Sequence, residues 1–144
     1  MSNINGEFKG FLNGILQLVN YATTDPNIIL NKAPITLIFT KVASERYSIV
    51  GQISLNLEGN NISIVKLSGV AQYDSHHNAL NVKFQGSTII FEYPIPLILT
   101  GSINLKNQYC MNKLSGNLDF LAIPTGEQAG LIGESVFSIR KEID

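Results

Sequence analysis

The sequence has few charged residues, no tryptophan and no excess of basic residues. Charged residues make up 15% of the 144 positions, against about 25% in an average globular domain. The net charge is −1, which argues against nucleic-acid binding, since that function usually requires a basic surface. Hydrophobic residues make up 44% of the chain, a content too high for a disordered segment. We therefore expect one folded domain over residues 1–144 that binds no nucleic acid.

Cysteine and long apolar runs are equally scarce. Cys110 is alone, so the chain cannot form an internal disulfide. Its neighbours, residues 107–111, offer no base that would activate it, so we expect an inert thiol in a reducing compartment. The first ten residues lack the basic and apolar regions of a signal peptide. No apolar run approaches the roughly 20 residues of a membrane helix, so a cytoplasmic protein without a membrane span is expected.

The common catalytic and cofactor motifs are missing as well. The sequence contains no Gly-x-Gly-x-x-Gly, no phosphate-binding loop, no Cys-x-x-Cys, no His-Glu-x-x-His and no Gly-x-Ser-x-Gly. We therefore predict no cofactor and no metal, and any enzymatic activity would have to be cofactor-free.

Alternation of apolar and polar residues dominates the chain. It is clear over 49–57, 80–84, 114–120 and 131–139, and it is typical of strands that bury one face. Turn-forming residues separate these runs, and Pro-containing stretches at 25–34 and 93–96 predict a loop and a sheet interruption. The short links exclude a parallel sheet and predict an antiparallel meander. The predicted strands lie near 35–43, 46–58, 61–73, 79–92, 96–106, 112–123 and 130–141.

The segment 6–19 carries two patterns at once. Its apolar residues have helical spacing from Phe8 to Val19, but its three glycines would each cost a helix about 1 kcal/mol relative to alanine. As a strand, it places these glycines on one face with Phe8, Leu12 and Leu16. The strand is favoured, and it gives an all-β fold of roughly eight strands that can close into an up-and-down barrel. A short N-terminal helix covering seven strands is the alternative.

Gly6-Glu7-Phe8 and Arg140 resemble two elements of the lipocalin/calycin barrels. That superfamily opens its first strand with Gly-x-Trp and often carries an arginine on the last strand that packs across the tryptophan. Here Phe8 takes the place of tryptophan, and Arg140 would close the barrel with its stem against Phe8. In size and strand number the chain is also similar to the allene oxide cyclase-like and dirigent-like barrels. Those resemblances imply ligand binding in a barrel or cofactor-free cyclisation.

Glu92 and Tyr93 are the candidate catalytic residues. Glu92 lies in an otherwise apolar stretch and shares its parity with Leu80 and Phe84, so it points inward if the strand is regular. Burial would raise the pKa of its carboxyl and suit it to general acid–base catalysis. The alternative is a bulge at Gly86-Ser87, which would turn Ile89 inward and leave Glu92 in water.

Other polar candidates have simple structural roles. Tyrosines 47, 73, 93 and 109 lie near strand ends, where their hydroxyls would be in water or meet a ligand. His76 and His77 follow Asp74 and could bind a metal or move a proton, but a solvated turn is the simpler interpretation.

The sequence thus predicts a barrel that binds a hydrophobic small molecule in its interior. The alternative is a cofactor-independent cyclase or isomerase that orients a flexible apolar substrate in the same interior. A third interpretation is an interaction protein, and the low charge leaves homo-oligomer formation open. The predicted ligand-binding wall consists of Phe39, Leu55, Tyr73, Val82, Phe84, Leu99, Leu118, Phe120 and Phe137.

Overall fold

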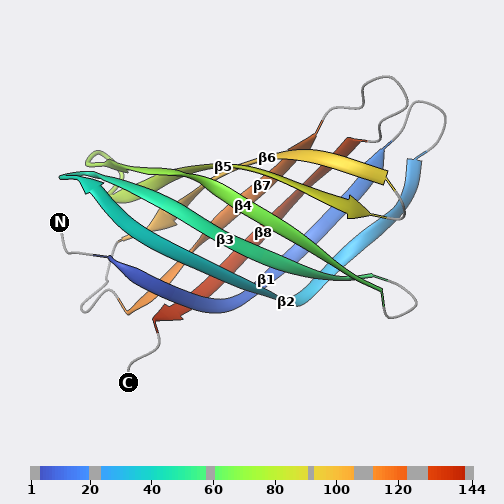
Figure 1. Ribbon diagram of the computed structural model, residues 1–144, viewed down its shortest axis with the longest axis horizontal. Helices are drawn as coiled ribbons and strands as arrows, with labels where there is room; N and C mark the ends of the chain where they lie inside the picture. The colour runs from blue at the N-terminus through green and yellow to red at the C-terminus, as the bar shows by residue number, and fades with distance from the viewer. Residues whose placement is uncertain are drawn as a thin grey trace.

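The protein is an all-β chain in the computed structural model, which describes residues 4–19, 24–57, 61–90, 93–105, 112–122 and 130–141. Every element in these ranges is a strand, as Figure 1 shows. The strands are β1 (Gly6–Val19), β2 (Thr24–Ala43), β3 (Arg46–Leu57), β4 (Asn61–Asp74), β5 (Ala79–Ile90), β6 (Tyr93–Asn104), β7 (Lys113–Ala122) and β8 (Gly130–Lys141).

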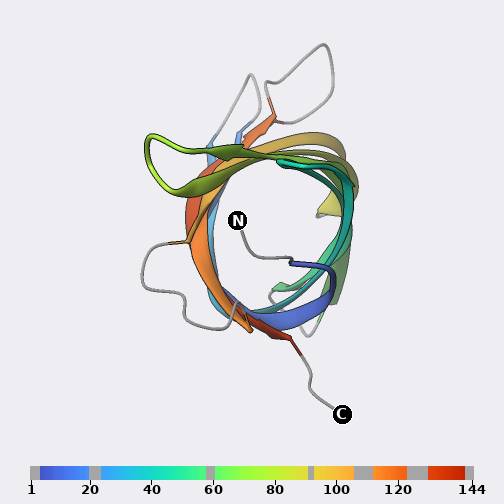
Figure 2. The same cartoon turned by 90° about the vertical axis from the view of Figure 1, so that its left-hand side faces the viewer.

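The eight strands close into one barrel in chain order, with β1 pairing with β8. All neighbours are antiparallel, and the ring is visible end-on in Figure 2. The predicted meander is confirmed. The segment 6–19 is a strand, so the helix alternative is wrong. Two neighbouring strands bond to its backbone, and a closed barrel leaves no edge strand, which together outweigh the helical spacing.

Inward-facing glycines let the strands approach closely. A Cβ on Gly101 would lie 1.8 Å from the carbonyl oxygen of Asn117, and one on Gly14 would lie 2.2 Å from that of Glu134. These distances are far below van der Waals contact, so a side chain at either position would force the neighbouring strands apart. Glycine at such positions permits the strong coiling of a small barrel.

The predicted loop near residues 25–34 is instead part of β2, which runs without a break to Ala43. Lys32 adopts a φ of 54°, and its N–H donates a 2.9 Å hydrogen bond to Oδ1 of Asn13. The irregularity places both Leu30 and Ala33 in the core, three residues apart. The proline-containing stretch at 25–34 therefore indicated a β-bulge, which changes the direction of the strand, and not a loop.

The predicted interruption at residues 93–96 is also wrong, because β6 begins at Tyr93. Pro94 and Pro96 pair with β5, whereas the pairing of β6 with β7 begins only at Ile98. Pro34 likewise precedes the first β2–β3 pair at Ile35. Pro34 lies where β2 pairs with β1 alone, so its missing N–H removes no ladder bond to β3, and the described part of β7 does not pair with Pro94 or Pro96.

The predicted bulge at Gly86-Ser87 does not occur, because β5 keeps its register with both neighbours. Thr88 is consequently buried, and Ile89 points outward with 64% of its surface exposed. Arg140 also differs from its predicted role. It lies outward on β8 opposite Lys9 and is exposed, because the inward parity of β8 belongs to Phe137 and Ile139.

The core lies inside the barrel as one continuous apolar cluster. At one end, Phe39 stacks edge-to-face on both Phe8 and Tyr47, with ring centroids 5.4 and 6.2 Å apart. Ile4 is 1% exposed, and its N–H donates to the Tyr47 hydroxyl over 3.3 Å. The predicted water-exposed hydroxyl of Tyr47 is therefore wrong, because Ile4 covers it and occupies this end of the barrel.

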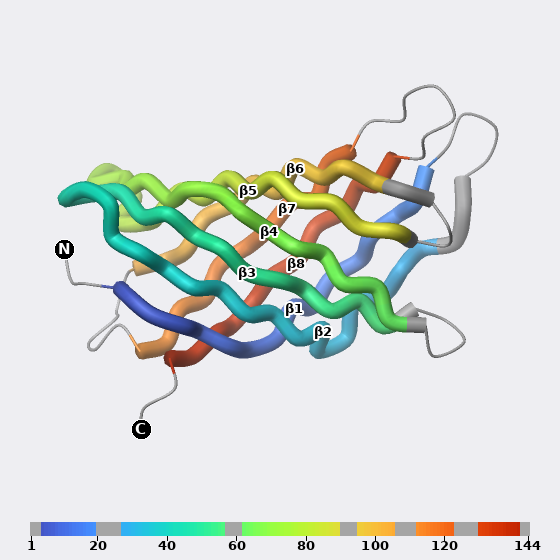
Figure 3. Tube along the Cα trace, viewed as in Figure 1, coloured from blue at the N-terminus to red at the C-terminus, as the bar shows by residue number. Residues whose placement is uncertain are grey.

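The two ends of the barrel differ, and they are named here for use below. The amino-terminal end is where β1 starts and where the β2–β3 and β4–β5 turns lie. The distal end is where β1 ends and where β5 passes to β6, and it lies on the right in Figure 3. Charged side chains line the amino-terminal end, whereas the described ranges 15–19, 27–31, 53–56, 62–65, 87–89, 95–99, 120–122 and 130–133 at the distal end contain none.

Candidate functional site

The predicted ligand-binding wall lies inside the barrel and is packed. Eight of its nine residues are less than 5% exposed and belong to the core cluster, while the ninth, Tyr73, is half-buried. Tyr73 lies at the amino-terminal end, where its hydroxyl donates a 3.2 Å hydrogen bond to Oδ1 of Asn78. The structure thus brings the apolar wall residues together in a filled core and keeps Tyr73 at the rim.

The barrel is open on its side at the distal end. The β4–β5 ladder stops at Lys66 and Ser87, although β3 and β4 stay paired to Asn61 and β5 and β6 stay paired to Tyr93. As a result, β4 and β5 separate at the distal end, as the tube in Figure 3 shows. The β2–β3 ladder stops at Ile35 and Ile53, so residues 54–56 of β3 have no ladder partner in the described part of β2, and residues 63–65 of β4 have none among residues 88–90 of β5.

A hollow of about 550 Å³ occupies the place where β4 and β5 separate. It combines outward side chains of both strands with inward side chains that belong to the barrel interior. Ile62 is 70% exposed at its mouth, whereas Ser63 and Thr88 are more than nine-tenths buried. The full lining is Ile62, Ser63, Ile64, Ser87, Thr88, Ile89, Ile95 and Pro96.

Two hydroxyl groups bridge the strands where the ladder is missing. The Ser63 Oγ and Thr88 Oγ1 atoms lie 2.7 Å apart. Ser63 Oγ also lies 2.5 Å from the carbonyl oxygen of Ile89, and Thr88 Oγ1 lies 3.1 Å from that of Ile64. Side-chain hydrogen bonds thus replace backbone bonds at the base of the hollow. The rest of its lining is uncharged and consists of Ile62, Ile64, Ile89, Ile95, Pro96 and the hydroxyl-bearing Ser87.

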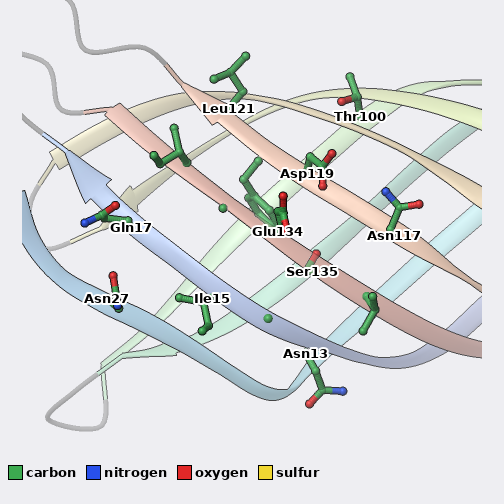
Figure 4. A pocket seen from close by; sticks show the side chains of 15 residues that line it. Asn13, Ile15, Gln17, Asn27, Thr100, Asn117, Asp119, Leu121, Glu134 and Ser135 are labelled. Carbon is green, nitrogen blue, oxygen red and sulfur yellow. The ribbon is translucent and has the colours of Figure 1, made fainter.

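A larger hollow of about 1150 Å³ lies on the outer face of β7, β8 and β1 (Figure 4). Its lining includes the outward amides Asn13, Gln17 and Asn117. Asp119 and Glu134 face each other across the β7–β8 ladder, and both are exposed. Its polar groups are not enclosed, because Asp119 and Glu134 are exposed and Gln17 and Asn117 are partly exposed.

The histidine pair lies in an exposed turn at the amino-terminal end, as the turn interpretation predicted. Asp74 Oδ2 is 2.7 Å from Nδ1 of His77, and Asp74 Oδ1 accepts the N–H of His76 over 3.0 Å. The hydrogen bond with the His77 side chain is the largest cause that lowers the pKa of Asp74. Among the residues that the structure describes, no group of three His, Cys, Asp or Glu side chains could hold a metal ion.

The predicted catalytic pair is not placed by the structure. Glu92 lies outside the described residues, as do Tyr109 and Cys110. The backbone of Tyr93 pairs with Ile90 at the start of β6, but its side chain lies outside the described part.

Sequence reasoning missed Ser63 and Thr88. The available signal was parity, since Ser63 alternates with the inward Val65 and Leu67, and Thr88 continues the inward series of Val82 and Phe84. A hydroxyl at an inward position needs a partner inside the barrel. What the parity could not show is that the partner strands separate at this point.

Comparisons with known proteins give one distant structural likeness. No protein-family model matches the sequence, and no curated protein matches it. Among solved structures, the chain is similar to a redesigned β-barrel at 6% sequence identity, with a TM-score of 0.47 over 97% of this chain and 92% of that one. Across the described ranges, no helix has the length and apolar character needed to cross a membrane.

Proposed function

We propose that this barrel binds a small amphipathic molecule in the hollow between β4 and β5. Ligand sites are typically concave, mostly apolar and about 300–1,000 Å³ in volume, with a few polar groups that fix orientation. The hollow has a volume in this range, about 550 Å³, and is open to solvent on one side; isoleucines line its walls, the hydroxyls of Ser63 and Thr88 lie at its base, and Ser87 adds a third hydroxyl to the lining.

The observation that carries the proposal is that inward and outward side chains line the same hollow. An apolar ligand body would pack against Ile62, Ile89 and Ile95, and its polar group would reach Ser63 and Thr88. Burying a chain of about eight methylenes contributes about 6 kcal/mol before the cost of association, which favours micromolar or weaker binding.

The β3–β4 hairpin supports an entry route beside the hollow. Among the described residues, 54–56 of β3 make no ladder pair with β2 and 63–65 of β4 make none with β5, so displacing them breaks no ladder bond to those two strands. Leu55 and Val65 hold it down, because both are fully buried. We also propose that the predicted wall residues, Phe84 and Phe120 among them, contact an apolar ligand deeper in the barrel. This contact requires the β3–β4 hairpin to move.

Titration with the neutral dye Nile red tests the proposal. We expect saturable fluorescence enhancement that weakens about tenfold or more in an Ile62→Lys variant, since a charge at the mouth must be desolvated when the apolar dye covers it. Ile29→Lys is the matched control, because Ile29 is also 70% exposed at the distal end but does not line the hollow. Equal affinity in both variants, or no saturation, would refute the site.

The alternative is a cofactor-free cyclase or isomerase that uses the same hollow. It is supported by Ile89 and Ile95, which line the hollow and stand in the chain shortly before and after Glu92 and Tyr93. Turnover of a flexible polyene that is lost in Glu92→Gln, with Nile red affinity unchanged, would establish this class. A Tyr93→Phe variant would test a second proton donor, and unchanged turnover in both would exclude the pair.

A further inference from the structure

We propose that Lys66 makes the hollow select amphiphiles whose head group is negatively charged. The proposal rests on the proposed function and names the class of ligand. Lys66 is exposed on the outer face of β4 and pairs with Ser87 of β5 at the point where the β4–β5 ladder stops. Because Ser87 lines the hollow, Lys66 lies beside the end of the hollow at which the two strands come together.

The Lys66 side chain can reach the hollow from this position. In an antiparallel pair, opposite residues have Cβ atoms about 5 Å apart, and residues two apart along a strand are separated by about 7 Å. Ser87 and Ile64 occupy these positions relative to Lys66, and both line the hollow. A lysine stem packs on apolar surface while its ammonium group stays in water, so the stem can lie on Ile64 with the charge over Ser87.

Lys66 has no carboxylate beside it in the described part of the sheet. Its partner on β3 is Gln52, its partner on β5 is Ser87, and its neighbours on the same face of β4 are uncharged. In the described strands β3 to β6, the single carboxylate is that of Asp74 at the amino-terminal end, where it is bonded to His77. The cation beside the hollow therefore attracts a negative head group and repels a positive one.

The lining gives such a ligand one orientation. Ser87 places a hydroxyl at the end beside Lys66, whereas Ile62 lies further along β4 and is 70% exposed at the mouth. An anionic head group near Ser87 would accept hydrogen bonds from the ammonium group and the hydroxyl, and the alkyl tail would cover Ile62. Polar groups placed at one side of an apolar site commonly fix the direction of a ligand.

The test compares probes of equal length and different charge. Octanoate, 1-octanol and octylammonium at pH 7 are titrated into the full chain and followed through its backbone amide NMR signals. Lys66→Gln removes the charge and keeps most of the stem. We expect it to weaken octanoate about threefold, to tighten octylammonium and to leave 1-octanol unchanged, which is the size of effect that an exposed ion pair supplies. Raising the salt concentration about tenfold should shrink the effect on octanoate.

Two further variants complete the comparison. Lys66→Glu reverses the charge, so octylammonium should gain affinity and octanoate should lose more than in Lys66→Gln. Lys83→Gln is the matched control, because Lys83 is also exposed but pairs with Val70, outside the hollow, and should leave all three affinities unchanged. Glu58 and Glu92 lie near these strands in the sequence but outside the described residues, and they are the same in every variant. Differences between the variants therefore report the charge at position 66.

The outcomes separate the two proposals. If 1-octanol shifts the amides of residues 62–65 and 87–89 but Lys66→Gln changes octanoate and octylammonium equally, or changes neither, the charge preference is overturned and the proposed function stands. If Lys83→Gln has the same effect as Lys66→Gln, the preference comes from the overall charge, and its assignment to Lys66 is overturned. If 1-octanol does not bind, or shifts only other amides, the site and the preference are overturned together.

Discussion

The two ends of this barrel are closed in different ways. At the amino-terminal end, side chains fill the opening: Phe8, Phe39 and Tyr47 stack on one another, and Ile4 lies over them. At the distal end, the ladder between β4 and β5 stops short, and Ser63 and Thr88 form the bridge. One closed sheet thus has an end filled by aromatic packing and an end where two hydroxyls bridge a gap in the ladder above buried aliphatic residues, and a ligand is expected at the second.

The largest expected effect comes from the packed end. Phe39→Ala removes the central ring of the aromatic cluster and should lower the free energy of unfolding by about 3–5 kcal/mol. Urea denaturation measures this loss. Ile38→Ala, on the outward side of the same strand, should change stability far less. A loss below about 1 kcal/mol for Phe39→Ala would mean that this end is not tightly packed.

The close approach of strands along the barrel wall gives the next effect. Gly101→Ala places a Cβ 1.8 Å from the Asn117 carbonyl oxygen, so β6 and β7 must move apart. We expect a loss of about 1–3 kcal/mol or more in thermal or urea unfolding. Thr100→Ala, one residue earlier and exposed, should remain within about 0.5 kcal/mol of the parent. Equal losses of stability in Gly101→Ala and Thr100→Ala would contradict the close approach of β6 and β7.

The hydroxyl bridge should contribute less and act locally. Thr88→Val keeps the shape of the side chain but leaves the Ile64 carbonyl without its donor, at a cost of about 1–3 kcal/mol. In hydrogen exchange, amides 62–65 should exchange faster than 67–71, and the variant should widen this difference. Uniform protection of the β4 amides from exchange would show that the distal end is held as tightly as the amino-terminal end.

The smallest expected effect is the pH response of the amino-terminal turn. The hydrogen bond with His77 lowers the pKa of Asp74 below its ordinary value of 3.8, so its ionised form is favoured in the folded state. The stabilisation is complete above that ordinary value and is lost as the pH falls through the lower folded pKa. Asp74→Asn should therefore destabilise the protein at pH 7 more than at pH 3. If Asp74→Asn lowers the stability by the same amount at pH 3 and at pH 7, the stabilising interaction between Asp74 and His77 is excluded.

The sequence by itself determined the all-β class, seven of the strands and most of the inward residues. Alternation at a period of two assigns each side chain to a face, and short links force neighbouring strands to be antiparallel. This is why the wall residues, such as Phe84 and Phe137, were correctly placed in the interior. For the segment 6–19 the sequence favoured a strand but left a helix open, and pairing with β2 and β8 decided for the strand.

Only the tertiary structure decided where the ladders end. Pro34 and Lys32 mark irregular positions in the sequence, but the first lies in a paired strand and the second in a bulge, because the neighbouring strand sets the register. Likewise, Ser63 and Thr88 are ordinary strand residues until β4 and β5 separate beside them. The hydrogen bonds that define the candidate site connect residues 24 to 26 apart in the sequence, and no local pattern specifies such a pairing.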